Sequence, residues 1–315
     1  MEGIGEREIL ITGGTGTLGK ALTRELIKDN SYKGIRIFSR DEEKHRVMRE
    51  EFGDNKRISY LVGDVADKDR LFRAMNGVDI VIHTAAMKQV PACEENPIEA
   101  VKTNINGTVN VIDCTINNEV EKVFFISTDK AVKPLNLYGA TKCVAEKLII
   151  DANLYSPHKT KFSCCRYGNI LGSRGSVLKI WKDLINDGQD ITVTSLPMTR
   201  FWLKKETAVK FILTCISNMH GGEIFIPKMK ACNMETFAEA FLEAIGENVF
   251  NIVETSIRPG EKIHEEIAVL GEMLHIVGNG KVNVHECEES MSSLIAEKYT
   301  LEEMSELIRE VMNNG

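Results

Sequence analysis

The stretch Gly13-Gly14-Thr15-Gly16-Thr17-Leu18-Gly19 joins an apolar run of residues to a helical one. Residues 8–12 (Glu-Ile-Leu-Ile-Thr) predict a buried strand before it, and residues 20–28 predict a helix after it. The first two of the spaced glycines permit a tight turn and close approach of a pyrophosphate, and the third permits tight packing of helix on strand. This context indicates a dinucleotide site rather than a ligand-free turn. The expected contacts are Gly13, Thr15, Gly16, Thr17, Leu18 and Gly19.

Charged residues follow the second predicted strand and bear on the identity of the dinucleotide. An acidic residue at this place usually binds the ribose 2′-hydroxyl of NAD, whereas an arginine suits the 2′-phosphate of NADP. Ser39 and Arg40 come first, with Lys44 close behind, which favours NADP as the cofactor. The acidic residues 41–43 keep NAD possible.

Two further strand ends carry residues suited to a dinucleotide. Asp64 and Val65 follow the third predicted strand, near the expected place of an adenine. Ala85 and Ala86 end the fourth, where small side chains would let a nicotinamide ribose approach. His83 in that strand is interpreted as a packed residue rather than a catalyst.

Strands and helical patterns alternate up to about residue 170. This alternation is typical of an α/β fold with a doubly wound parallel sheet, the Rossmann architecture, which binds ligands at the carboxyl ends of its strands. Residues 1–170 are expected to form the NADP-binding domain, completed by later segments. Residues 171–315 are expected to form mainly a smaller C-terminal substrate-binding lobe interleaved with it, ending in a helix pair over 288–315. The predicted strands lie near residues 8–12, 35–38, 58–64, 78–85, 122–128 and 162–170.

The composition limits the classes of protein to which the chain can belong. Its 315 residues are 43% hydrophobic, which is enough for a large core, and no apolar run reaches the length of a bilayer span. The acidic N-terminus is unlike a signal peptide. A net charge of −7 without a basic tract argues against nucleic acid as a partner. We therefore expect a cytoplasmic protein that has no membrane partner.

The eight cysteines lie apart, and none forms a C-x-x-C pair or a His/Cys array with zinc spacing. Reduced, buried thiols and no bound metal are the expectation. Cys143 adjoins Lys142 but points to a different face of the predicted helix, so it is interpreted as structural.

The segment 127–142 carries residues with catalytic chemistry. Tyr138 and Lys142 are four residues apart, so they share one face of a helix. An ammonium beside a phenol lowers the pKa of the phenol from its reference of about 10. Such a tyrosine can take a proton from a sugar hydroxyl while hydride moves to a nicotinamide. Asp129 and Lys130 form an adjacent acid–base pair that could remove water from the oxidised sugar; a surface ion pair is the alternative interpretation.

Six motifs, in this order along the chain, resemble those of the extended short-chain dehydrogenase/reductase family. Within it, the chain most resembles the C5-inverting UDP-N-acetylglucosamine 4,6-dehydratases of pseudaminic acid biosynthesis. The resemblance runs from about residue 8 to the segment 258–265, and the tail beyond matches poorly. The motifs are Thr12–Gly19, Ala85–Pro91, Ser127–Ala131, Asn136–Lys142, Arg166–Asn169 and Met198–Phe201.

Two positions connect the resemblance to this group of enzymes. Related hexose-nucleotide dehydratases carry Asp-Glu where this chain has Asp129-Lys130, whereas the N-acetylglucosamine enzymes carry Asp-Lys. Membrane-anchored relatives that retain the C5 configuration carry Met where this chain has Tyr138. The resemblance therefore implies the inverting enzymes.

The resemblance implies a lyase that acts on UDP-N-acetylglucosamine with bound NADP. C4 is oxidised, water is eliminated across C5–C6, and hydride returns to C6, which gives UDP-2-acetamido-2,6-dideoxy-beta-L-arabino-hex-4-ulose. The implied base for the C4 hydroxyl is Tyr138, with Thr128 as hydrogen-bond partner of that hydroxyl and Lys142 on the nicotinamide ribose. Asp129 is the implied acid for the C6 hydroxyl and Lys130 the implied C5 base. Asp129 must then be protonated near neutral pH, and Lys130 must be partly neutral.

The resemblance also implies residues that hold the substrate, and a homo-oligomer, either a dimer or a hexamer. Cationic side chains are expected on the UDP diphosphate. Lys88 is expected near the sugar and the cofactor, with a solvent-facing loop lysine as its alternative. Asn104 is assigned to the cofactor site, and a purely structural role competes with this assignment. The remaining implied substrate contacts are Tyr167, Asn169, Arg174, Thr199, Arg200, Arg258 and Glu261.

Two other functions stay open at this point. A nucleotide-sugar 4-epimerase would also need Tyr138 and Lys142, but it needs no acid–base pair at 129–130. A non-catalytic dinucleotide-binding sensor would need neither set of residues, and the presence of Thr128, Tyr138 and Lys142 argues against it.

Overall fold

A nine-stranded sheet forms the centre of the computed structural model, which describes residues 7–156, 160–173, 175–247, 249–278 and 280–313. Its strand order is β15-β14-β10-β6-β5-β4-β1-β2-β3, and every neighbouring pair is parallel except β14 and β15. The expected doubly wound parallel sheet is confirmed, and the six expected strands are present with small shifts at their ends. The strands are β1 (Arg7–Thr12), β2 (Tyr32–Ser39), β3 (Ile58–Val62), β4 (Ile80–His83), β5 (Lys122–Ile126), β6 (Lys161–Cys165), β10 (Ile224–Pro227), β14 (Met273–Gly278) and β15 (Lys281–Glu286).

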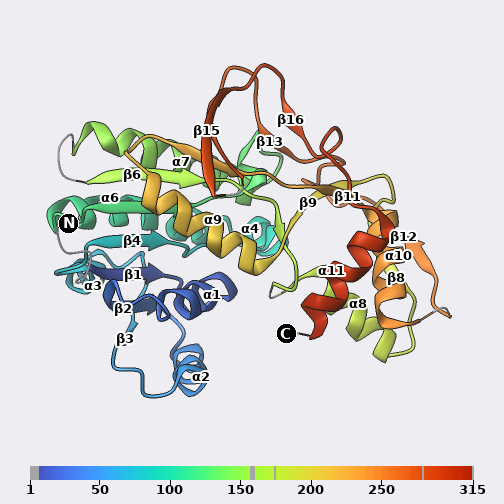
Figure 1. The fold of residues 1–315 in the computed structure, drawn as a ribbon, viewed down its shortest axis with the longest axis horizontal. Coiled ribbons are helices and arrows are strands. Elements are labelled where there is room, and N and C mark those ends of the chain that lie inside the picture. Colours follow the sequence, from blue (N-terminus) through green and yellow to red (C-terminus); the bar gives the residue numbers. More distant parts are fainter. Residues whose placement is uncertain (1–6, 157–159, 174, 248, 279, 314–315) are drawn as a thin grey trace.

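Helices cover both faces of this sheet, as Figure 1 shows. Side chains alternate between the two faces of a strand, so Ile9 and Ile11 of β1 enter one core while Leu10 enters the other. The first core packs against α1 (Thr17–Leu26), α2 (Glu42–Phe52) and α9 (Lys205–Asn218). The second packs against α3 (Lys68–Met75), α6 (Gly107–Asn117) and α7 (Leu137–Asp151).

A smaller lobe lies beside the sheet, at the right of Figure 1. Its core surrounds Trp181, whose ring centroid lies 5.5 Å from that of Phe237 and 5.4 Å from that of Phe241. Trp202 stacks on the same Phe237 at 4.2 Å. The elements of this lobe are α8 (Val177–Asn186), α10 (Met234–Ile245), α11 (Leu301–Asn313), β8 (Ile191–Val193) and β12 (Ile252–Glu254).

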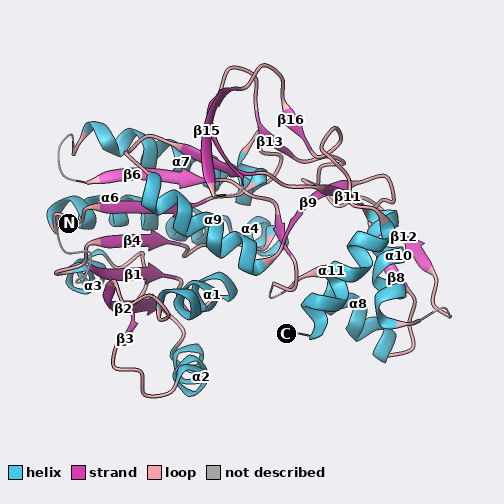
Figure 2. Ribbon diagram, viewed as in Figure 1, coloured by secondary structure: helices cyan, strands magenta, loops and turns pink. Residues whose placement is uncertain are grey.

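Short strands lie between the sheet and the lobe and at the top of the molecule as drawn in Figure 2. Three strands form a small sheet, β7 (Asn169–Ile170), β9 (Thr199–Leu203) and β11 (Ala231–Asn233), and two more form a pair, β13 (Glu266–Ala268) and β16 (Met291–Ser292). Near the central sheet lie α4 (Val90–Glu95), α5 (Pro97–Val101), the π-helix η1 (Lys102–Asn106), and the 3-10 turns η2 (Asp129–Ala131) and η3 (Ala152–Leu154).

The helix pair expected over residues 288–315 is wrong. Only α11 is helical in the described part of this segment, and Met291–Ser292 pair with β13 instead. The reason is hydrogen bonding to a distant segment: the Ser293 amide donates to the Glu265 carbonyl at 2.7 Å, and the Glu265 amide donates to Ser293 Oγ at 2.9 Å. These tertiary contacts outweigh the helical pattern of a few acidic residues.

A buried ion-pair cluster ties the C-terminal segments to the central sheet. Arg166, at the end of β6, donates to both carboxylate oxygens of Glu146 on α7 and to both of Glu272. It also donates to the Ile267 carbonyl at 3.2 Å. This cluster fixes β13 close to the end of β5.

In the part of the chain that the structure describes, no helix has the length and apolarity that crossing a bilayer requires.

Candidate active site

The expected cofactor residues gather at the carboxyl edge of the sheet, where the chain reverses its direction of winding. β1 has β2 on one side and β4 on the other, and ligands of open α/β sheets bind at such a switch point. Gly13 directly follows β1, Ser39 ends β2, and Ala85 follows β4. The sequence therefore places these residues correctly at one edge.

The glycine-rich turn is packed too closely for side chains. Gly13 has a φ of +65°, and a Cβ there would lie 2.8 Å from the Cα of Ala85. A Cβ on Gly19 would lie 2.4 Å from the carbonyl oxygen of Gly14, so this glycine permits α1 to pack on the turn. Gly16 stands at the N-cap of α1 without a side chain to cap it. The positive end of the α1 dipole is thus open to a phosphate, and Thr15, Thr17 and Leu18 lie in the same turn.

The residues expected to distinguish NADP from NAD lie at the ends of β2 and β3. The Ser39 hydroxyl is within 2.9 Å of Thr15 Oγ1 and 3.0 Å of His45 Nε2. Arg40 is exposed and lies 3.4 Å from Asp64 Oδ2, while Lys44 pairs with Asp41. Asp41 is the N-cap of α2, since its side chain accepts from the Lys44 amide.

Two other expected cofactor residues are fixed by their neighbours. Val65 is buried, and a Cβ on Gly107 of α6 would come within 2.7 Å of its Cγ2. Asn104 is buried in the π-helix, exchanges hydrogen bonds with the backbone of Met87 at 2.8 Å, and donates to Thr141 Oγ1 at 3.0 Å. Asn104 thus ties the loop that carries Ala86 and Lys88 to α7.

His83 is fully buried between Thr12 and Thr108, at 2.7 Å and 3.2 Å. Burial lowers the pKa of His83 to about 3, with a further contribution from the charge of Lys142. The interpretation of His83 as a packed strand residue is confirmed.

The eight cysteines are free thiols, of which Cys143 is half-buried and the others are buried.

The catalytic segment is assembled by a close approach of two backbones. A Cβ on Gly139 would lie 2.2 Å from the carbonyl oxygen of Lys130, so only glycine lets the first turn of α7 rest against η2. Asn136 caps α7 by accepting from the Gly139 amide at 2.8 Å, and it donates to the Gly260 carbonyl at 2.9 Å. Tyr138 is therefore held beside Thr128, whose hydroxyl donates to Asp129 Oδ1 at 2.9 Å.

The two lysines act differently from what the sequence predicts. Burial raises the pKa of Tyr138 to about 12, and the charge of Lys130 is the main factor that opposes this rise. The ammonium of Lys142 donates to the Ile126 carbonyl at 2.6 Å and lies 3.8 Å from the centre of the Phe125 ring. Burial lowers the pKa of Lys142 to about 7. Lys130 therefore limits the rise in the pKa of Tyr138, whereas Lys142 is engaged with the Ile126 carbonyl.

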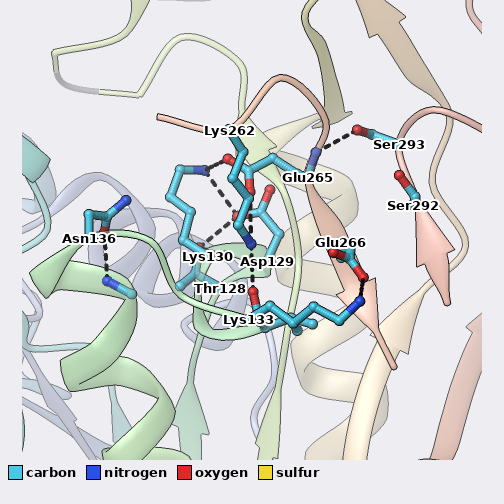
Figure 3. A network of polar contacts seen from close by, with 12 residues as sticks. Thr128, Asp129, Lys130, Lys133, Asn136, Lys262, Glu265, Glu266, Ser292 and Ser293 are labelled. Carbon is cyan, nitrogen blue, oxygen red and sulfur yellow. Dashed lines mark hydrogen bonds and ion pairs between the residues drawn. The ribbon is translucent and has the colours of Figure 1, made fainter. Parts of the chain in front are cut away.

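Lys130 also differs from the expectation that it is partly neutral. Its Nζ lies 3.0 Å from Asp129 Oδ1, 3.4 Å from Glu265 Oε1 and 3.5 Å from Asn169 Oδ1. Burial disfavours its charge, but the two carboxylates outweigh burial and raise the pKa of Lys130. Figure 3 shows this amine between the two acidic side chains. Asp129 is fully buried, and its Oδ2 accepts no hydrogen bond within the described structure.

Two of the expected substrate residues, Thr199 and Arg200, are buried and bonded to other protein groups. The Arg200 guanidinium is buried and donates to the carbonyls of Thr199, Ile263 and Lys262, at 2.8–3.1 Å. Thr199 is buried as well, and its hydroxyl lies 2.8 Å from His264 Nδ1 and 2.7 Å from Ser293 Oγ.

The remaining expected substrate residues surround the same edge. Tyr167 is buried, and its carbonyl accepts from the Asp129 amide at 3.1 Å. Arg258 is exposed, and its amide donates to Glu261 at 3.4 Å. Lys88 is exposed as a residue, yet its surroundings lower the pKa of its ammonium by desolvation and by the nearby charge of Lys130. Arg174 lies outside the described residues.

Comparison with known proteins identifies the family of this fold and site. The sequence profile of the family described as "Polysaccharide biosynthesis protein" matches residues 9–286. The chain belongs to the polysaccharide biosynthesis protein family.

Two relatives of this family member carry names of different enzymes. UDP-N-acetylglucosamine 4,6-dehydratase (inverting) of Campylobacter jejuni subsp. jejuni serotype O:23/36 (strain 81-176) is 48% identical over 261 residues, which cover 82% of this chain and 76% of that protein. UDP-glucose 4-epimerase of Rickettsia massiliae (strain Mtu5) is 41% identical over 272 residues, which cover 85% and 79%. Among solved structures, Pen from Bacillus thuringiensis superimposes with a TM-score of 0.90 at 37% identity over 98% of both chains. The resemblance inferred from the motifs is confirmed.

Two features of this polysaccharide biosynthesis protein were missed by sequence reasoning. Glu265, at the end of the last motif, lies 3.4 Å from Lys130 Nζ, which also contacts Asp129 (Figure 3). Ser293 holds Glu265 in place from a tail that carries no recognisable motif. The position of Glu265 within the segment 258–265 was a usable signal for the first, whereas no signal in the sequence marks Ser293.

Proposed function

We propose that this chain is an NADP-dependent UDP-N-acetylglucosamine 4,6-dehydratase that inverts C5, and thus a hydro-lyase. The observation that carries the proposal is the acid–base pair Asp129–Lys130 at the carboxyl edge of the sheet. The backbone of this pair rests against the first turn of α7, which carries Tyr138. The 48% identity to an enzyme of this name supports it. An ion pair at the surface, the alternative from the sequence, does not describe a pair in which Asp129 is fully buried.

The cofactor residues fit a nicotinamide dinucleotide. The turn Gly13–Gly19 would hold its pyrophosphate, and Tyr138 with Lys142 would lie near its nicotinamide ribose; when bound, the nicotinamide accepts hydride from C4 and returns it to C6. Two observations favour NADP over NAD. Asp41 caps α2 and pairs with Lys44, so its carboxylate already has partners. Arg40 is exposed at the end of β2, where an arginine suits the 2′-phosphate of NADP.

The protein groups divide the proton transfers between them. Tyr138 would accept the C4 hydroxyl proton, with Thr128 orienting the hydroxyl. Lys130 would then take the proton from C5, and Asp129 would give one to the leaving C6 hydroxyl. A proton would return to the opposite face of C5 as hydride adds to C6, which balances the proton that Tyr138 accepted. Transfer of one proton from Lys130 Nζ to Asp129, across 3.0 Å, puts both groups in the forms that this step needs. Asp129 would receive that proton on Oδ1, the oxygen that lies 3.0 Å from Lys130 Nζ.

The parts of residues 171–315 that lie outside the central sheet would bind the UDP part of the substrate. Arg258 is the cation best placed for the diphosphate, because its side chain is exposed while that of Arg200 is already bonded to carbonyl oxygens. Arg200 would instead support the wall of the site, beside Glu261 at 3.7 Å. We further propose a cytoplasmic homo-oligomer, dimer or hexamer, that supplies pseudaminic acid biosynthesis.

Mass spectrometry and NMR of the purified protein with UDP-N-acetylglucosamine, without added cofactor, test the proposal. Loss of one water and a new C6 methyl signal are expected, and the ring couplings report the C5 configuration. An unchanged substrate after incubation with and without NADP would refute the proposal.

A 4-epimerase is the second candidate, because the Rickettsia relatives named UDP-glucose 4-epimerase are 41% identical to this chain. An epimerase would convert the substrate to its galacto isomer at constant mass. The same experiment therefore separates the two functions, and the presence of Asp129–Lys130 favours the dehydratase.

A further inference from the structure

Glu265 is a buried carboxylate that sequence reasoning assigned to no role. It is 3% exposed, and a carboxylate in such a place requires a compensating charge. Three cations face it: Lys130 at 3.4 Å from Oε1, Arg200 at 3.9 Å from Oε1, and Lys262 at 3.9 Å from Oε2. Oε2 itself accepts no hydrogen bond from the described residues.

Lys130 is the nearest of these cations, and the other two are engaged elsewhere. Lys262 Nζ donates to the Val132 carbonyl at 2.6 Å. Arg200 donates to three backbone carbonyls, as described above. Glu265 therefore acts mainly on Lys130, whose ammonium Figure 3 shows in contact with Asp129 as well.

Hydrogen bonds to Ser293 fix the main chain of Glu265 in this position. Its amide and carbonyl both bond to Ser293, whose hydroxyl lies 2.7 Å from Thr199 Oγ1 on β9. The next residue, Glu266, begins β13 and points to the other side, where it pairs with the exposed Lys133 at 2.6 Å. Two adjacent glutamates thus meet two different lysines.

We propose that Glu265 is a positioning residue that holds the Lys130 ammonium against Asp129 and thereby disfavours the neutral amine that can act as a base. The effect of Glu265 on catalysis rests on the proposed function. Its effect on the protonation of Lys130 does not depend on that function. Two carboxylates outweigh the opposing positive charges around this amine. The charged and titratable groups that face Lys130 are Asp129, Glu265, Arg200, Lys88 and Tyr138.

Glu265→Gln removes the charge and keeps the shape, so it tests the proposal directly. The rate of acetylation of Lys130 by trace acetic anhydride, relative to that of the exposed Lys33, is measured by peptide mass spectrometry from pH 7 to 10. An opposite charge at this distance favours the protonated amine by a factor of at least about ten. Labelling of Lys130 in Glu265→Gln should therefore be about tenfold faster at each pH than in the unaltered protein.

Two control variants separate charge from packing. Glu266→Gln makes the same change one residue away, and labelling of Lys130 should stay unchanged in it. Glu265→Asp keeps the charge, and labelling should stay closer to that of the unaltered protein than to that of Glu265→Gln. Equal labelling in Glu265→Gln and the unaltered protein, or the same acceleration in all three variants, would overturn the proposal.

The value of kcat gives the catalytic readout. The form that reacts has the shared proton on Asp129, and Glu265 disfavours that form by stabilising the charged amine, so kcat of Glu265→Gln should exceed that of the unaltered protein by up to about tenfold at neutral pH. An unchanged or lower kcat with accelerated labelling would refute the catalytic part alone. A chain without dehydratase activity would refute the proposed function and leave the labelling result intact.

Discussion

Gly139→Ala is expected to disable the site without touching any reacting group. The added Cβ would lie 2.2 Å from the Lys130 carbonyl oxygen, whereas ordinary contacts of this kind begin at 3.4 Å. The opposing atom belongs to the backbone, so the first turn of α7 and η2 must separate by about 1 Å. This movement carries Tyr138 away from Thr128 and the Asp129–Lys130 pair.

A displacement of about 1 Å between reacting groups can cost about 100-fold in rate. Overpacking at such a place also destabilises by about 1–3 kcal/mol. We therefore expect kcat for product formation to fall about 100-fold, with a measurable decrease in the melting temperature. Product is followed by mass spectrometry, and unfolding by circular dichroism.

Gly278→Ala is the matched control, because a Cβ there would meet nothing closer than Lys228 Cβ at 3.8 Å. It should retain the activity and stability of the unaltered protein. Full activity in Gly139→Ala would show that α7 and η2 can separate without consequence, and the reasoning from backbone contact to catalysis would be refuted.

Three further variants test other parts of the structure. Lys130→Ala should keep its bound dinucleotide, measured by absorbance after gel filtration, and lose dehydration, because the C5 base is gone; full activity would place that base elsewhere. Arg40→Asp should weaken NADP binding by about tenfold or more in calorimetry, since a charged hydrogen bond is lost; unchanged affinity would remove the case for NADP. Lys142 has a pKa of about 7 in the folded protein, below its ordinary value, so the unfolded chain binds one more proton between pH 7 and 10. The free-energy cost of burying this amine is therefore complete below pH 7 and decreases as the pH rises. Lys142→Met removes this cost, so its gain in the free energy of unfolding over the unaltered protein, measured with urea, should decrease by up to about 1.4 kcal/mol per pH unit from pH 7 to 9. A gain that stays constant over this range would contradict the reasoning.

The cofactor edge could be predicted from the sequence because its signals are local. Gly13, Gly16 and Gly19 lie within one turn and directly follow an apolar strand, so spacing alone fixes their environment. The strand ends at Ser39, Asp64 and Ala85 follow from the same alternation. Tyr138 and Lys142 were placed on one helix for the same reason.

The electrostatics of the site could not be predicted, because they depend on partners that are distant in the chain. Glu265 meets Lys130 only because Ser293 and the Arg166 cluster fold the C-terminal segments back onto the sheet. Once there, it reverses the expected protonation of Lys130. The failed helix pair at 288–315 has the same origin, since a tertiary pairing with β13 decides the conformation of a segment with a weak pattern.

The late position of Glu265 in the chain has a consequence for how the protein is made. Roughly 100 residues separate it from β6, and ribosomes add about 5–20 residues per second, so the first six parallel strands leave the ribosome about 5–20 s before Glu265 does. During that interval the glycine-rich turn is complete, whereas Val132 and Asn136 still lack Lys262 and Gly260 as partners. We expect a nascent chain to acquire its dinucleotide before it can hold a sugar nucleotide.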